Sequence, residues 1–455
     1  MNKENSKIIN EKLELYCEKC KNNLEISEDV YSEFNVKRGL RNKDGTGVIA
    51  GATNISNVHG YIINEYEKLP DHGELLYRGI DVNDIINSCT SEDRFGFEEV
   101  IWLLLFGSLP NKDEIEKFSV LLDEFRELPD TFIEDMIIKA PSPNVMNKMA
   151  RSVLALYSYD DNPDDISFQN IFRQSIELIS RISTIMVNAY QVKKRYYDHE
   201  SLFFHVPISG LSIAENILST MRMDRKFTRA EAKLLDICLI LHAEHGGGNN
   251  STFACRVLSS SGTDTYSAVA AGIGALKGPR HGGANIKVIE MLDYMKAGIS
   301  DYNDDDEIYS YLKRIFAKEE GDKSGLIYGL GHAVYTKSDP RAVILKQNAM
   351  TLAKEKGYEQ DFKLLDAVER LGPQILASKK GASDNICANV DLYSGLVYRM
   401  LDIPPELYTP LFAVARMAGL CAHRIEEATT CKKIIRPGYK SLIGKNQYIP
   451  LNERK

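Results

Sequence analysis

The sequence predicts a nearly all-α fold, and three observations lead to this prediction. Thr228 and Glu231 form a capping box that opens a helix through LLDICLILHAEH, a stretch that is apolar on nearly all sides. Asp339 and Pro340 supply an N-cap and a first-turn proline for a second long helix, which extends to Gly357. Strand-like segments with clean alternation of apolar and polar residues are few.

The N-terminal elements follow from local composition. Residues 1–35 are polar and predict a helical arm, whereas residues 36–80 are rich in Gly, Asn and Asp and alternate in YIINEY. We expect a small β-hairpin in this second segment. Phe97–Phe106 reads FEEVIWLLLF and predicts an apolar helix that ends near Gly107 and Pro110.

Three further segments have local signals. Thr265–Lys277 predicts a helix of small residues, stopped by Gly278-Pro279. Thr409-Pro410 repeats the N-cap and proline pair before LFAVARMAGLCAHRIEEA, so we expect a helix whose N-cap is Thr409. The acidic run DYNDDDE at 301–307 predicts a solvated loop between helices rather than a ligand site.

Composition excludes several classes of protein. The chain has 455 residues, 44% hydrophobic and 26% charged, and a net charge of −8, which disfavours general binding to nucleic acid or to an anionic membrane. The N-terminal text has no apolar signal core, and no apolar run approaches the ~18 residues of a membrane span. We therefore expect a soluble, cytoplasmic protein. The eight cysteines are scattered, as in reduced proteins, and Cys17 and Cys20 form a lone CxxC without a second pair.

Three of the nine histidines lie close together in sequence, beside Gly-rich turns. His242 and His245 are three residues apart at the end of a predicted helix, where they would lie on roughly one face, and His281 stands in PRHGGAN. Spacing alone leaves open core histidines or a two-histidine metal pair. HExxH is absent and no Cys or carboxylate cluster completes a ligand set, so we predict no metal. Asn249 and Ser251 supply donors that could hold a carboxylate.

The run Gly272-Ile-Gly274-Ala-Leu-Lys-Gly278 superficially resembles a dinucleotide fingerprint. It has the spacing GxGxxxG, lies within helical text and follows no strand, so the fingerprint fails on context. We interpret these glycines as positions for helix packing.

Other candidate residues stand at predicted element boundaries or in apolar text. His332 lies in GLGHAVY and Asp391 in NVDLYSG. Arg341, Arg416 and Arg436 lie in DPRAVIL, LFAVARMAG and KIIRPGY. A guanidinium in an apolar stretch of sequence needs a hydrogen-bonding or charged partner, which an anionic substrate could provide. A buried ion pair with a nearby carboxylate is the alternative for Arg416.

Together these motifs resemble the citrate synthase family. The pattern H-x-x-H…GGN-x-S, GP-x-HGGAN, G-x-GH-x-V-Y…DPR, NVD-x-YSG, FAVAR…G…AH and RP…Y occurs in the family's order over about residues 240–440. GELLYRGIDVNDI and FEEVIWLLLFGSLP are also similar to the family's N-terminal half. Each motif is short, but their order makes the match specific.

The resemblance implies an architecture and a reaction. A large helical domain would comprise residues 1–283 and 395–455, and a small helical domain, 284–394, would close over it. The implied enzyme is a homodimeric acyltransferase of the tricarboxylic acid cycle that needs no metal or redox cofactor. It would condense acetyl-CoA with oxaloacetate to give citrate and CoA. Synthesis of 2-methylcitrate from propionyl-CoA remains the alternative, because one methyl group gives only ~10–200-fold discrimination.

The resemblance also implies roles for individual residues. Asp391 would be the base that removes a methyl proton of acetyl-CoA, His281 would donate a hydrogen bond to the enol oxygen, and His332 would polarise the ketone of oxaloacetate. The residues expected to bind oxaloacetate are His245, Asn249, Arg341, Arg416 and Arg436, the last from the second subunit. Lys337 and Arg280 are candidates by position for the CoA phosphates.

The chemistry needs these residue types. A carboxylate alone cannot remove so weakly acidic a proton, and a hydrogen-bond donor must stabilise the enolate oxygen as it forms. Arginine forks match the two carboxylates of oxaloacetate. Gly282-Gly283 and Gly395 are candidate hinges for the closure that would dry the site.

Overall fold

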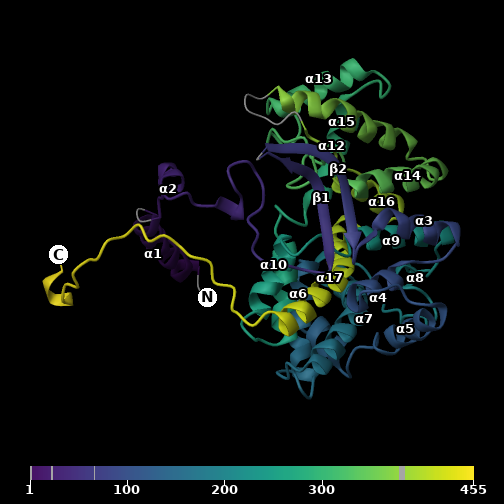
Figure 1. The fold of residues 1–455 in the computed structure, drawn as a ribbon, viewed down its shortest axis with the longest axis horizontal. Coiled ribbons are helices and arrows are strands. Elements are labelled where there is room, and N and C mark those ends of the chain that lie inside the picture. Colours follow the sequence, from purple (N-terminus) through teal and green to yellow (C-terminus); the bar gives the residue numbers. More distant parts are fainter. Residues whose placement is uncertain (1–2, 22–23, 66, 379–384, 455) are drawn as a thin grey trace. The chain divides into compact units, whose positions relative to one another are not determined.

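A computed structural model describes residues 3–21, 24–65, 67–378 and 385–454, and its fold is predominantly helical, as predicted (Figure 1). The described chain divides into two compact units. One combines the segment up to Ala50 with the segment from Arg436, and the other spans Gly51–Ile435. None of the described helices is both long and apolar enough to cross a membrane.

The first unit contains the predicted helical arm. Its elements are α1 (Lys3–Lys21), α2 (Glu28–Glu33) and the short 3₁₀ turns η1 (Arg38–Leu40) and η6 (Leu451–Glu453). Ser27 caps α2 by accepting a hydrogen bond from the Asp29 amide. Cys17 and Cys20 are exposed free thiols in α1.

The second unit begins with the predicted hairpin. Strands β1 (Ser56–Asn64), β2 (Glu67–Tyr77) and β3 (Ile80–Asp81) form an antiparallel sheet in that order. β1 and β2 run against the loop that follows His332. A Cβ at Gly73 would lie 2.2 Å from the Ser338 carbonyl oxygen, and one at Gly60 would lie 2.7 Å from Tyr335 Cα. Only glycine permits this approach, so the sheet supports that loop.

Helices before residue 284 build most of the second unit. They are α3 (Val82–Ser91), α4 (Phe97–Phe106), α5 (Lys112–Glu124), the π-helical turn η2 (Ile133–Ile138), α6 (Val145–Leu156), η3 (Tyr157–Tyr159), α7 (Phe168–Lys193), η4 (Lys194–Asp198), α8 (Ile213–Met221), α9 (Arg229–His242), α10 (Asn250–Ser259) and α11 (Thr265–Leu276). The predictions for α4 and for the Thr228 capping box of α9 are confirmed. Gly107 ends α4 in the left-handed conformation, with φ of 87°.

The remaining elements follow residue 284. They are α12 (Ala284–Gly298), α13 (Asp305–Phe316), α14 (Pro340–Glu355), α15 (Glu359–Ala377), α16 (Asp391–Met400), η5 (Pro405–Leu407) and α17 (Tyr408–Thr430). Asp339 caps α14 with Pro340 at its first position, as predicted. The buried helix α17 packs against α7, α10, α9 and α4 (Figure 1).

Two local predictions are wrong. The acidic run is not all loop, because Asp304 accepts hydrogen bonds from the amides of Asp306 and Glu307 and thereby starts α13. Thr409 does not cap α17, which already begins at Tyr408 as a continuation of a 3₁₀ turn. Its hydroxyl donates instead to the Gly282 carbonyl at 2.8 Å. A carboxylate or hydroxyl near the start of a helix can form hydrogen bonds with several different groups, and the neighbouring sequence does not determine which of these bonds forms.

The glycines of α11 differ in their surroundings. A Cβ at Gly272 would lie 2.9 Å from Leu420 of α17, so packing explains this glycine. Gly274 has nothing within 4 Å of that position, and the packing interpretation is wrong for it.

Candidate active site

Two histidines and a tyrosine from two distant segments meet in one cluster. His245 Nε2 lies 3.2 Å from the Tyr335 hydroxyl, and the His245 and His332 ring centroids are 5.1 Å apart. The rings of His332 and Tyr335 stack at 4.6 Å. His245 lies in the turn after α9, so the prediction that it shares a helix face with His242 is wrong. Burial lowers the pKa of His245 well below its usual value, which keeps its ring neutral.

The backbone fixes the tautomer of His332. Its Nδ1 accepts hydrogen bonds from the amides of Val334 and Tyr335, at 3.0 and 3.1 Å. A neutral imidazole that accepts at one nitrogen carries its proton on the other, so Nε2 is the donor. The loop that carries His332 is also held by Thr336, whose hydroxyl accepts a hydrogen bond from the Asp71 amide in β2 at 3.1 Å. His332 therefore presents an N–H from a fixed position.

His281 is held as a neutral donor by the start of α10. The Ser251 amide donates to His281 Nε2 at 3.3 Å, and the Ser251 hydroxyl lies 3.1 Å from the same nitrogen. Accepting at Nε2 leaves the proton on Nδ1. Burial, together with the charge of Arg416, lowers the pKa of His281 to about 4. The positive N-terminal end of α10 also disfavours protonation of His281.

Arg416 is fully buried in α17 and only partly satisfied. Its Nε donates to the His242 carbonyl and one terminal nitrogen donates to Asn249 Oδ1, both at 2.9 Å, while its other terminal nitrogen is buried without a partner. Within the described part of the chain no carboxylate forms an ion pair with it, so the buried ion-pair interpretation is wrong. Burial lowers the pKa of Arg416 to about 10, which leaves it a cation suited to an anion.

Asn249 connects Arg416 to His281. It occupies the N-cap position of α10 but makes no capping bond with its side chain. Its Oδ1 accepts instead from Arg416 and from the Ser251 hydroxyl, at 2.9 Å each. The Gly-rich turn therefore orients two predicted site residues at once. The edge of His281 also faces Phe412, whose ring lies 4.7 Å from the Arg416 guanidinium.

Asp391 is the first residue of α16 and is tied to the loop that carries His332. The Asp391 amide donates to Asn389 Oδ1 at 3.1 Å, and Asn389 Nδ2 donates to the Gly331 carbonyl at 2.9 Å. Burial raises the pKa of Asp391 to about 6, although Arg341 acts in the opposite direction. A carboxyl with this pKa is a stronger base than an exposed one and is still ionised at neutral pH.

Arg341 is buried and paired with Asp339. Its Nε and one terminal nitrogen donate to the two carboxylate oxygens at 3.0 and 2.7 Å. The Val390 amide also donates to Asp339 at 3.2 Å, which connects this pair to Asp391. The Arg341 guanidinium lies 5.6 Å from the centre of the Tyr335 ring. Asp339, which the sequence indicated only as a helix cap, therefore also positions Arg341.

The sequence did not single out a buried charged network around Glu244. This carboxylate accepts from Ser56, from the Gly246 amide and from His423, at 2.9, 2.6 and 2.9 Å. His423 Nδ1 in turn accepts from Arg256 at 2.6 Å. Glu244 lies between His242 and His245, and the acid in HAEH and the histidine in AHR were the only signals for it. The network fixes the turn of His245 to α17.

Gly419 makes that contact possible and gives a sharp test. A Cβ there would lie 2.3 Å from Glu244 Oε2 and 2.5 Å from the Ala243 carbonyl oxygen. We expect Gly419→Ala to lower the free energy of unfolding by about 1–3 kcal/mol, as overpacking does. Gly274→Ala is the matched control, because it lies in a helix with open space and should be neutral or stabilise by about 0.5–1 kcal/mol. Urea denaturation measures both, and equal effects would contradict the packing argument.

His242 lies apart from this chemistry. Its Nδ1 donates to the Cys238 carbonyl at 2.7 Å and burial lowers its pKa to about 3. Its role is therefore structural, because its carbonyl holds Arg416. No group of three or more potential metal ligands occurs among the described residues.

The remaining predicted residues are Arg280, Lys337 and Arg436. Arg280 and Lys337 are exposed and no ion pair involves them in the described part of the chain. Arg436 is also exposed and belongs to the first unit, whereas every other predicted residue lies in the second.

The predicted residues of this cluster are two buried cations, three neutral imidazoles and the carboxylate of Asp391, and Asp339 adds the carboxylate that pairs with Arg341. The cations can bind an anionic substrate, His281 and His332 can donate hydrogen bonds to developing oxyanions, and Asp391 can accept a proton. Such a set suits removal of a carbon-bound proton next to a carbonyl, followed by addition to a second carbonyl.

Comparison with known proteins agrees with this chemistry. A family model described as "Citrate synthase, C-terminal domain" matches residues 42–438. The citrate synthase of Synechocystis sp. is 34% identical over 417 residues, which cover 90% of this chain and 94% of that protein. The 2-methylcitrate synthase 1 of Corynebacterium glutamicum is 29% identical over 93% of this chain and 100% of its own length.

Solved structures give the same result. Citrate synthase from Thermoplasma acidophilum, in a ternary complex with carboxymethyl coenzyme A and oxaloacetate, has a TM-score of 0.75 and 28% identity.

 This match covers 92% of this chain and 99% of that one. Citrate synthase from Thermotoga maritima has a TM-score of 0.71 and 29% identity, again over 92% of this chain and 99% of that one.

Proposed function

Because this chain belongs to the citrate synthase family, we propose that it condenses acetyl-CoA with oxaloacetate and water to give citrate and CoA. The observation that carries the proposal is the buried Arg416, which has one terminal nitrogen without a partner and whose charge acts with burial to lower the pKa of His281 and of His245. This arrangement suits a dianionic keto acid better than a neutral substrate.

In this proposal Asp391 removes a methyl proton of acetyl-CoA while His281 donates from Nδ1 to the thioester oxygen. Neither group is sufficient alone, since the carboxylate is a weak base and the enolate needs a donor as its charge develops. His332 donates from Nε2 to the ketone oxygen of oxaloacetate and makes its carbon electrophilic. The new carbon–carbon bond forms there, and water then hydrolyses the thioester to release CoA.

Oxaloacetate binding is assigned to the two buried arginines and their neighbours. Arg341 and Arg416 would each face a carboxylate, and His245 and Asn249 would add hydrogen bonds. We further propose that Arg436 completes the site from the second subunit of a homodimer.

Domain closure is part of the same proposal. Residues 284–394 would form the moving small domain, with hinges at Gly282-Gly283 and Gly395, and the remaining residues would form the large domain. Closure would exclude water from the enolate. Lys337 and Arg280, both exposed, are proposed contacts for the CoA phosphates. The proposed reaction requires no metal or redox cofactor, and we propose a cytoplasmic location.

An assay of CoA thiol release tests the reaction, with oxaloacetate omitted as the control. We expect release from acetyl-CoA that depends on oxaloacetate, with a kcat/KM about 10-fold or more above that for propionyl-CoA. The 2-methylcitrate reaction is the second candidate, because a 2-methylcitrate synthase matches 93% of this chain. A preference for propionyl-CoA would select it, and no release with either thioester would reject both.

The pKa of Asp391 predicts an acid limit of activity. Because burial raises this pKa to about 6, the carboxyl loses its basic form as the pH falls through that value. We expect kcat/KM for acetyl-CoA to be constant near pH 8 and to fall about tenfold for each pH unit well below the pKa. Circular dichroism over the same range controls for unfolding. Full activity about two units below this limit would contradict the assignment.

A further inference from the structure

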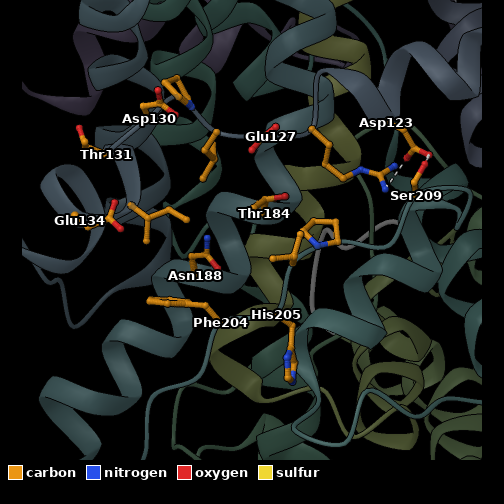
Figure 2. Close-up of a pocket in the computed structure, with 16 residues that line it drawn as sticks. Asp123, Glu127, Asp130, Thr131, Glu134, Thr184, Asn188, Phe204, His205 and Ser209 are labelled. Carbon is orange, nitrogen blue, oxygen red and sulfur yellow. Dashed lines mark hydrogen bonds and ion pairs between the residues drawn. The ribbon is translucent and has the colours of Figure 1, made fainter.

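A cavity lies in the helical body, and none of the predicted site residues lines it (Figure 2). Its volume is about 440 Å³, and its walls come from the end of α5, the turn η2, one face of α7 and the segment around Phe204. A volume of this size suits a small organic molecule rather than a single ion.

The least exposed polar residue that lines this cavity is Asn188. Asn188 of α7 is only 4% exposed, and among the described residues its side-chain amide makes no hydrogen bond. Figure 2 shows it between Thr184 and Phe204, and all three residues line the cavity. This amide is therefore available to a ligand in the cavity that can hydrogen-bond to it.

Apolar side chains form much of the remaining wall. Leu128, Ile133, Phe204 and Val206 all line the cavity. A ligand therefore needs an apolar body as well as a polar group, because burying this surface is favourable only against apolar atoms.

The charged residues that line the cavity favour a cationic ligand. Arg126, the one arginine in the wall, is already neutralised by Asp123 at 2.8 Å. Glu127, Asp130 and Glu134 are exposed and form no ion pair in the part of the chain that the structure describes. Figure 2 shows these three acids among the residues that line the cavity, whose net charge is therefore negative.

We propose that this cavity binds an amphipathic organic cation, an amine carried on an apolar or aromatic body. The body packs against Phe204 and Ile133, the ammonium group lies among the three acids, and the Asn188 amide accepts or donates a hydrogen bond. The inference is independent of the proposed catalytic activity, since the two sites share no residue.

Isothermal titration calorimetry at low ionic strength tests the proposal with three probes of matched shape. These are 4-phenylbutylamine, 4-phenylbutan-1-ol and 4-phenylbutanoate. We expect saturable binding of the amine, at least about tenfold tighter than the alcohol, and no binding of the acid. Failure of the amine to bind, or equal affinity for all three, would overturn the proposal.

Variants then locate the binding. Asn188→Leu and the double variant Glu127→Gln with Glu134→Gln should each weaken amine binding about fivefold or more. Glu124→Gln is the matched control, because Glu124 is an exposed carboxylate at the end of α5 that does not line the cavity. If Asn188→Leu fails to fold by circular dichroism, the surface double variant still decides. Unchanged affinity in the double variant would overturn the site.

Discussion

Replacing Asp391 with asparagine is expected to lower kcat by about 10²–10⁴-fold while oxaloacetate still binds. Asparagine keeps the shape of the side chain and the start of α16 but cannot take up a proton. The bonds that position this residue come from its backbone amide and from Asn389, so they survive the change. Steady-state kinetics with both substrates, and calorimetry with oxaloacetate alone, measure the two effects separately.

Asp304→Asn is the matched control for this variant. Asp304 also lies at a helix start, and asparagine is an equally good N-cap, so folding and kcat should both be unchanged. If Asp391→Asn retains nearly full activity, Asp391 is not the base, whereas loss of oxaloacetate binding would show that its role is structural.

Replacing Arg416 with leucine is expected to raise the KM for oxaloacetate by at least about 30-fold. In the leucine variant a buried carboxylate of oxaloacetate would lose its charged partner, which costs about 2–5 kcal/mol. Arg416 is suited to be that partner, because it has a terminal nitrogen that no described residue satisfies. The free protein should tolerate the change, because a buried cation without a carboxylate is itself unfavourable. Arg416→Lys keeps the charge but not the fork and should give an intermediate KM.

Arg424→Leu controls for the loss of any buried arginine from α17. Arg424 is 1% exposed, and one of its nitrogens donates to the Thr263 carbonyl at 2.6 Å. We expect this control to change the unfolding midpoint without changing the KM for oxaloacetate. A normal KM in Arg416→Leu, with folding verified by circular dichroism, would contradict the binding role.

Much of the fold could be predicted because its signals are local. The capping box at Thr228, the Asp339-Pro340 start of α14 and the stop at Gly107 each act within a few residues, and all three occur as predicted. Thr409 failed for the opposite reason, since its hydroxyl found a partner at Gly282, far away in the sequence.

The candidate site could be predicted in residue type but not in contacts. Motif order indicated His281, His332 and Asp391, whereas the acid in HAEH and the histidine in AHR gave no sign that Glu244 and His423 are in contact. This contact joins a turn after α9 to His423 in α17, and such a pair is visible only once the two helices pack together.

The sequence by itself determined the helices, the family and the set of reactive side chains, because caps, periodicity and motifs are properties of neighbouring residues. Only the tertiary structure decided how those side chains behave. It left Arg416 without a carboxylate, made His281 and His332 donors at opposite nitrogens, and raised the pKa of Asp391. Each of these depends on burial and on partners from distant segments, and the energies of charges and hydrogen bonds are set by those surroundings.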